Sequence, residues 1–276
     1  MTPASSLLTL VGGLALGYLV LLGGMYAYQR GLLYHPDRSA PVAPITLGLV
    51  GMEEVWLKTE DGLRLNAWYA PPAPGKRGVL LYLHGNAGNL ASLPAKLSPY
   101  LGIGLGVLAL DWRGYGKSEG SPTEEGLYAD GRAALAFLAG LGVPVSQVVL
   151  HGESLGSGVA TQLAVETGPA GVILEAPYLS VAEAAQFHYP YLPARWLVKD
   201  RFDNLVRIGA IRSPILILHG DLDQTVPVSH GRALLAAAGP EARGRFFPQA
   251  GHANLFDFGA QKEVQDFIRR IFEAEK

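Results

Sequence analysis

Leu150-His-Gly-Glu-Ser-Leu-Gly-Ser-Gly158 places a serine, Ser154, between Gly152 and Gly156. The Val-rich residues 145–150 predict a short buried strand, and the apolar residues that follow the serine predict a helix. Glycine at 152 and 156 suits a tight turn from strand to helix, because side chains there would collide with both elements. Such an elbow aims the serine hydroxyl at the positive end of the helix, where developing negative charge is favoured. Ser154 is therefore a candidate nucleophile.

The N-terminal part of the chain carries a long apolar run. No charged residue lies between Leu7 and Tyr28, and at about 1.5 Å per residue this run covers roughly 33 Å, enough to cross a bilayer. A cleaved signal peptide is the competing interpretation, but no Lys or Arg precedes the run, which is too long and ends without an Ala-x-Ala site. A buried core helix is the third interpretation, and it is less favoured because the run is apolar on all faces rather than on one stripe. We therefore predict a transmembrane anchor over residues 1–30.

The charges after this run bear on its orientation. The positive charges of Arg30 and Arg38 favour a cytoplasmic location for the rest of the chain, and the negative charge of Asp37 partly offsets them. The chain has no cysteine, which removes disulfides from consideration but does not fix the compartment. We expect a single-pass protein of the cell membrane, and the sequence leaves the side of its body open.

Residues 31–276 are enough to form one sizeable hydrophobic core but are too few for two domains. The net charge is −2 and the charged residues are scattered singly, so the sequence offers neither a basic stripe for nucleic acid nor an acidic tail. Pro71-Pro-Ala-Pro-Gly-Lys76 is the one biased stretch and predicts a turn between strands. We expect a single domain over 31–276 and no nucleic-acid partner.

Short apolar runs alternate with helix-like stretches along this domain. Residues 55–59 and 64–69, joined by Glu60-Asp-Gly62, predict a hairpin. Runs typical of strands buried on both faces cover residues 79–83, 107–110, 148–150, 171–174, 215–218 and 245–247. Stretches that favour helices cover residues 90–101, 123–140, 154–167, 230–238 and 260–273. The alternation predicts an α/β fold with a mostly parallel central sheet and helices on both faces.

Polar side chains follow several of these strands at their carboxyl ends, where active sites gather in such sheets. Ser154 follows strand 148–150. Asp221 and Asp223 follow strand 215–218, and His252 follows the last strand. The order serine, acid, histidine is that of an α/β-hydrolase triad and differs from the orders in chymotrypsin and subtilisin.

The chain resembles the α/β-hydrolase-fold serine hydrolases from about Leu32 to the C-terminus. The resemblance rests on the elbow, on Gly251-His252, and on His84-Gly-Asn-Ala-Gly-Asn89, Asp111-Trp-Arg-Gly-Tyr-Gly-Lys-Ser118 and Pro214-Ile-Leu-Ile-Leu-His-Gly-Asp-Leu-Asp-Gln-Thr-Val-Pro227. Within that family it is most similar to the membrane-anchored bud-emergence-like group, which includes acyl-protein thioesterases. These motifs are specific for the α/β-hydrolase fold and much less specific for the substrate.

A serine hydroxyl needs a base to attack a carbonyl, and an imidazole can take the proton and return it to the leaving group. His252 is the predicted base, because it follows the last strand in a loop that can bring the ring to Ser154. His84, His151 and His219 also stand at strand ends before a glycine. We expect each of these three to hydrogen-bond a loop carbonyl instead.

The acid of a triad holds the histidine tautomer and stabilises the imidazolium that forms. Asp223 matches the family position, four residues beyond His219. Asp221 is one alternative, with a turn-forming role as the other interpretation of that residue. Glu175 is a second alternative, at the end of strand 171–174, where some relatives carry the acid.

The resemblance implies that backbone amides of Asn86 and Leu155 receive the oxyanion of the tetrahedral intermediate. The side chains of Asn86 and Asn89 are expected to stabilise their loop rather than act directly, and the turn at 111–118 is expected to shape the site. The glycine-rich residues 84–89 lack the Gly-Lys-Ser/Thr of a P-loop and the spacing of a dinucleotide fingerprint. We expect no cofactor and no metal, because the His and acidic residues are too dispersed for a metal signature.

An insertion over residues 177–208 occupies the usual cap position of the fold. Its apolar side chains can pack on the sheet or line an acyl-chain pocket; they are Phe187, Tyr189, Tyr191, Leu192, Trp196, Leu197 and Val198. A membrane anchor favours lipids and lipidated proteins as partners, because they meet a tethered enzyme at high local concentration.

The sequence thus predicts a membrane-anchored serine hydrolase of acyl esters or thioesters. A catalytically silent scaffold that binds a lipid or a protein is the alternative from another class. A peptidase or amidase of the same fold also stays open, because one triad serves all acyl transfers. The oligomeric state and the acyl chain length are not fixed by the sequence.

Overall fold

The computed structural model describes residues 3–273, and one mixed sheet lies at its centre. Its strands lie in the order β2-β3-β6-β4-β7-β8-β9-β10. They cover Glu53–Lys58 (β2), Arg64–Ala70 (β3), Val79–Leu83 (β4), Gly106–Leu110 (β6), Val148–Glu153 (β7), Gly171–Glu175 (β8), Ile215–Gly220 (β9) and Ala242–Phe247 (β10). β3 is antiparallel to both of its neighbours and the other pairs are parallel, so the predicted hairpin and mostly parallel sheet are confirmed.

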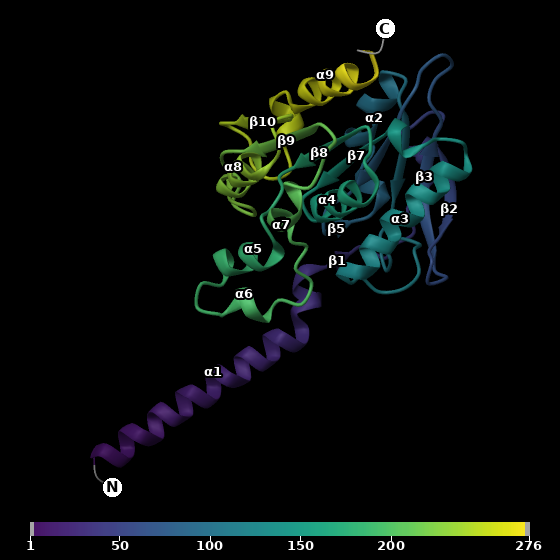
Figure 1. The fold of residues 1–276 in the computed structure, drawn as a ribbon. Coiled ribbons are helices and arrows are strands. Elements are labelled where there is room, and N and C mark those ends of the chain that lie inside the picture. The colour runs from purple at the N-terminus through teal and green to yellow at the C-terminus, as the bar shows by residue number, and fades with distance from the viewer. Residues whose placement is uncertain (1–2, 274–276) are drawn as a thin grey trace.

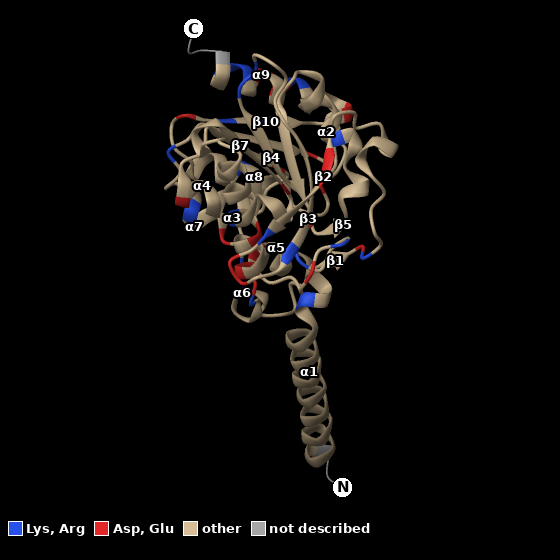
Figure 2. Cartoon of the chain, turned by 90° about the vertical axis from the view of Figure 1, so that its right-hand side faces the viewer, with Lys and Arg blue, Asp and Glu red and all other residues tan. Residues whose placement is uncertain are grey.

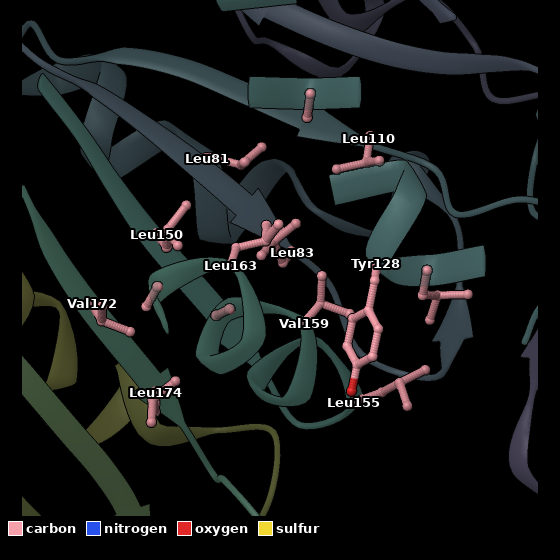
Figure 3. Close-up of a cluster of buried hydrophobic side chains, with 14 of the residues drawn as sticks. Leu81, Leu83, Leu110, Tyr128, Leu150, Leu155, Val159, Leu163, Val172 and Leu174 are labelled. Atoms are coloured by element: carbon pink, nitrogen blue, oxygen red, sulfur yellow. The ribbon is translucent and has the colours of Figure 1, made fainter. Parts of the chain in front are cut away.

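Helices cover both faces of this sheet (Figure 1). They are α2 (Pro94–Gly102), α3 (Glu124–Gly140), α4 (Leu155–Thr167), α8 (Val228–Ala237) and α9 (Ala260–Glu273). Leu81 and Leu83 of β4 join side chains of α3, α4 and α8 in one buried cluster, part of which Figure 3 shows. Leu80 and Tyr82 join α2 and α9 in a second cluster. Because successive strand residues point to opposite faces, a strand between two cores must be apolar throughout.

Two predicted boundaries are wrong, for local reasons. Residues 145–147 form a 3-10 turn after Pro144, so the buried strand begins at Val148. Residues 90–101 divide into a 3-10 turn at 90–92 and α2, because Pro94 has no N–H to donate and starts a new helix. The other predicted strands and helices are present with ends shifted by a few residues.

The insertion predicted at 177–208 forms short helices outside the sheet, and we call it the cap insertion. The helices are α5 (Val181–His188), α6 (Ala194–Leu197) and α7 (Asn204–Ile208). Ser180 starts α5 by accepting a hydrogen bond from the Glu183 amide, with an O–N distance of 3.1 Å. Pro190 and Pro193 separate α5 from α6, which keeps each helix short.

The N-terminal apolar run forms one helix, α1 (Pro3–Leu33), that projects from the body (Figure 1). The most apolar 18-residue stretch within residues 4–33 has a mean hydropathy of 2.0, and none of that stretch is buried inside the protein. Arg30 is the single charged residue in α1, and Figure 2 shows a helix free of charge up to the body. By length and composition α1 can cross a membrane, and it ends three residues beyond the predicted boundary at 30. After α1, β1 (His35–Pro36) pairs in parallel with β5 (Ala87–Gly88).

The elbow between β7 and α4 requires close backbone packing. Ser154 is the N-cap of α4 and adopts a left-handed φ of 49°, which a non-glycine residue adopts only under strain. A Cβ on Gly156 would lie 1.9 Å from the Leu83 carbonyl oxygen, and one on Gly152 would lie 2.4 Å from the Gly156 oxygen. The glycines expected from the sequence are therefore required by backbone contacts on both sides of the serine.

Gly156→Ala tests this constraint against Gly140→Ala, whose Cβ meets nothing within 4 Å. We expect Gly156→Ala to lower the free energy of unfolding by about 3 kcal/mol, because a backbone carbonyl cannot move aside as a side chain can. Gly140→Ala should change it by less than about 1 kcal/mol, in the stabilising direction. Urea unfolding in detergent measures both values, and equal effects of the two substitutions would contradict the packing described here.

Candidate active site

The structure brings Ser154, His252 and Asp223 into one hydrogen-bonded chain. They come from the loops that follow β7, β10 and β9 at the carboxyl edge of the sheet. The Ser154 Oγ lies 3.0 Å from His252 Nε2, and His252 Nδ1 lies 2.7 Å from Asp223 Oδ2. An ionised carboxylate only accepts, so Nδ1 carries the ring proton and Nε2 is left to accept the serine proton.

Hydrogen bonds keep the Asp223 carboxylate ionised. Its Oδ1 accepts from the amides of Thr225 and Val226, each at 2.8 Å. The Nε2 of His219 lies 3.2 Å from Oδ2 and donates to the Val226 carbonyl at 2.8 Å. Burial would raise the pKa of Asp223, but the hydrogen bonds from His219, His252 and Val226 outweigh it and lower the pKa well below the usual value. His219 thus contacts the acid as well as the predicted loop carbonyl.

The alternative acids have other partners. Asp221 forms an ion pair with Arg232 at 2.9 Å. Glu175 is fully buried beside Lys96 and accepts a hydrogen bond from His151 Nε2 at 3.0 Å. Burial would raise the pKa of Glu175, but the Lys96 ammonium and the His151 hydrogen bond hold it below its usual value.

A buried polar network lies directly behind the elbow, and the sequence did not indicate it. Lys96 of α2 contacts Glu175 and lies 3.4 Å from Glu153, the residue before the serine. Tyr82 donates to the second oxygen of Glu153 at 2.5 Å. The Ser154 amide in turn donates to the Glu175 backbone carbonyl at 2.8 Å. The network therefore fixes the end of β7, which the serine follows, against the end of β8.

His84 and His151, the other two histidines at strand ends, have structural partners. His84 is buried, and its Nδ1 lies 2.8 Å from the Gly85 carbonyl. Burial lowers the pKa of His84 to about 4, so its ring is neutral at physiological pH. His151 lies between Glu175 and the Tyr100 hydroxyl, which is 2.9 Å from its Nδ1. Carboxylate and hydroxyl thus take the place of the loop carbonyl predicted for His151.

Asn86 and Leu155, the predicted oxyanion residues, line the same cavity as Ser154. The Asn86 carbonyl accepts from the Tyr115 hydroxyl at 2.8 Å and from the His35 amide at 2.9 Å. The Asn86 side chain donates to the Leu33 carbonyl at 2.9 Å. These bonds hold the loop after β4 in place, as expected for the side chain of Asn86, and they tie this loop to the end of α1.

The Asn89 side chain also stabilises its own loop. Its Oδ1 accepts from the Ala91 amide at 2.9 Å, and its Nδ2 donates to the Ser39 carbonyl at 3.0 Å.

Tyr178, at the start of the cap insertion, donates to the Leu155 carbonyl at 3.0 Å. This contact, which no sequence pattern indicated, joins the cap insertion to the first turn of α4.

Asp111 shapes the turn beside the site. Its Oδ1 accepts a hydrogen bond from the Leu90 amide at 2.8 Å, and its carbonyl accepts one from the Ser118 hydroxyl at 2.8 Å. Burial raises the pKa of Asp111 to about 7, because desolvation of the carboxylate outweighs the Leu90 hydrogen bond. The turn at 111–118 therefore supports the loop after β4.

A cavity of about 360 Å³ opens above Ser154. Its walls are largely apolar and come from the cap insertion and from α1. Within residues 3–273, no three His, Asp or Glu side chains are grouped as a metal would require. The arrangement offers a hydroxyl, a base that can take its proton, a buried acid behind the base, and an apolar space for a substrate.

Comparisons with known proteins agree on the family. Residues 78–207 match a family model described as the alpha/beta hydrolase fold. The chain is 39% identical to uncharacterized protein Rv2307c of Mycobacterium tuberculosis over 90% of this chain and 88% of that one. It is 33% identical to alpha/beta hydrolase domain-containing protein 17B of Homo sapiens, over 76% of this chain and 73% of that one. The solved structure of the Pyrococcus furiosus esterase Pf2001 superposes with a TM-score of 0.72, at 19% identity, over 87% of this chain and 98% of that one.

Asp111→Asn tests the buried carboxyl of the 111–118 turn. The folded-state pKa of about 7 lies above the usual 3.8, so the folded protein binds this proton more tightly than the unfolded chain. The free energy of unfolding of the wild type therefore falls as the pH rises from about 4 to about 7, by at most about 1.4 kcal/mol per pH unit from this group.

Asp111→Asn lacks the titrating carboxyl, so its free energy of unfolding should fall less than that of the wild type between about pH 4 and about pH 7. Urea unfolding of both proteins at several pH values measures the difference between them. A difference that stays constant from about pH 4 to about pH 7 would show that Asp111 is ionised throughout.

Proposed function

The chain belongs to the α/β-hydrolase family, and on that premise we propose that it is a membrane-tethered serine hydrolase of carboxylic esters and thioesters. The observation that carries the proposal is the chain of hydrogen bonds from Ser154 through His252 to Asp223. Ser154 lies at the wall of an apolar cavity, within reach of a carbonyl bound there. The substrates proposed are acyl or lipid compounds.

In the proposed acylation step, His252 Nε2 takes the Ser154 proton as Oγ attacks the substrate carbonyl. The amides of Leu155 and Asn86 receive the oxyanion, assisted by the positive end of α4. Collapse of the tetrahedral intermediate breaks the bond to the alcohol or thiol, which leaves with the proton from His252. Water then attacks the acyl-enzyme in the same manner and releases the acid.

Asp223 holds His252 for both steps. With Oδ2 accepting from Nδ1, the ring keeps Nε2 free for the serine, and the carboxylate stabilises the imidazolium that forms. Its lowered pKa supports this role, because the acid stays ionised while the histidine gains and loses a proton.

The apolar cavity supports acyl substrates. Tyr178, Val181 and Leu192 of the cap insertion line it together with Ser154. The resemblance to the membrane-anchored group that includes acyl-protein thioesterases supports thioesters among the substrates. The same triad would serve amides, so peptides are the substrates to test against this proposal.

The tether is α1. Its length, hydropathy and lack of charge up to Arg30 support a membrane span, and a cleaved signal sequence passes the same test. The contacts of α1 favour the span, since Gln29 and Arg30 hydrogen-bond to the cap insertion. Cleavage after this helix would remove those contacts and one wall of the cavity.

A fluorophosphonate probe tests the serine mechanism. We expect wild-type protein in detergent to be labelled, Ser154→Ala to lose the label, and the distant Ser98→Ala of α2 to keep it. Hydrolysis of a short p-nitrophenyl ester should fall by about 10⁵-fold in Ser154→Ala. Folded wild-type protein that neither reacts with the probe nor cleaves the ester would instead favour a silent scaffold that binds a lipid or a protein partner.

A further inference from the structure

The C-terminal part of α1 forms one wall of the cavity above Ser154. Leu22, Met25, Gln29 and Leu33 line it and are partly shielded from solvent. They are spaced three or four residues apart, so they form one face of the helix. The facing wall comes from α5 and α6 of the cap insertion, including Ala185. The cavity therefore lies between the proposed membrane helix and the cap insertion.

Polar contacts fix α1 against the cap insertion. The Gln29 side chain donates to the Leu197 carbonyl at 3.2 Å and accepts from the Lys199 amide at 2.7 Å. Arg30 binds Asp200 through two hydrogen bonds of 2.8 and 3.0 Å, and Asp200 is only 5% exposed. A helix that served only as a tether would not need these specific contacts.

The loop between α5 and α6 contacts α1 much closer to the N-terminus of that helix. The Tyr18 hydroxyl donates to the Tyr191 carbonyl at 2.8 Å. Tyr18 precedes Arg30 by 12 residues, which is about 18 Å along a helix. The interfacial layer of a bilayer is only about 6 Å thick on each side, so with Arg30 at the polar surface this contact lies at the level of the acyl chains.

Exposed aromatic side chains occur on the same part of the cap insertion. Trp196 is 85% exposed and Tyr191 is 62% exposed. Large amphipathic rings of this kind are favoured at the membrane–water interface. Their position beside α1 supports a cap insertion that enters the membrane from its interface to the level of the acyl chains.

We propose that the substrate's acyl chain enters from the bilayer between α1 and the cap insertion and lies along the Leu22–Met25 face, with its carbonyl at Ser154. This inference rests on the proposed hydrolase function and makes α1 a part of the acyl-binding site. Lipids and lipidated proteins already in the membrane are then substrates whose acyl chains need not cross water. A short, soluble ester needs only the part of the cavity next to Ser154.

Leu22→Trp and Leu21→Trp form a matched pair that tests this proposal. Leu22 lines the cavity, whereas its neighbour Leu21 is 45% exposed and lies outside the lining. The full chain is reconstituted in phosphatidylcholine vesicles and supplied with p-nitrophenyl palmitate in the membrane or with soluble p-nitrophenyl acetate. We expect Leu22→Trp to lower the palmitate rate at least about tenfold more than it lowers the acetate rate. Leu21→Trp should match wild type on both esters.

Ala185→Leu narrows the cavity from the facing wall and leaves α1 itself unchanged. It should show the same selective loss of palmitate hydrolysis. If all three variants cleave palmitate as fast as wild type, α1 does not bind the acyl chain and the inference is wrong, while acetate hydrolysis still supports the proposed function. If wild type cleaves neither ester, the proposed function itself fails. An equal loss of palmitate hydrolysis in Leu21→Trp and Leu22→Trp would also overturn the inference, since a general effect on the membrane helix would explain it.

Discussion

The close contact between Gly156 and the Leu83 carbonyl is the constraint on which the site depends. It lets the first turn of α4 lie directly against the end of β4, and it requires the left-handed backbone at Ser154 between them. The serine is thereby raised from the sheet edge, where the loops after β9 and β10 can reach it. Asp223 and His252 meet it there, at distances suited to proton transfer.

This strained turn is supported from behind by buried charge. Lys96 lies between the carboxylates of Glu153, at the end of β7 just before the serine, and Glu175, at the end of the neighbouring β8. A buried ion pair adds little stability in itself, but removal of one partner leaves a charge without compensation. The network therefore holds these strand ends in one arrangement and limits the movement of the nucleophile.

Most of the fold could be predicted from the sequence, because continuous apolar runs mark strands between two cores and the glycines mark the elbow. The three residues of the hydrogen-bonded chain could be predicted from their order and their positions at strand ends. The role of Lys96 could not, since a lysine on a helix is ordinarily exposed and its partners lie far away in the sequence. The packing of α1 could not be predicted either, because a helix that is apolar on all sides offers no preferred face.

The most direct test of the account is the identification of the acylated residue. Full-length protein in detergent is mixed with p-nitrophenyl acetate, quenched in acid during the first turnover, digested and analysed by mass spectrometry. The account predicts a burst of p-nitrophenol and an acetyl group on the peptide that carries Ser154, at the modified position Ser154 itself. Ester cleavage with no burst and no modified peptide, or with the acetyl group on another residue, would contradict it.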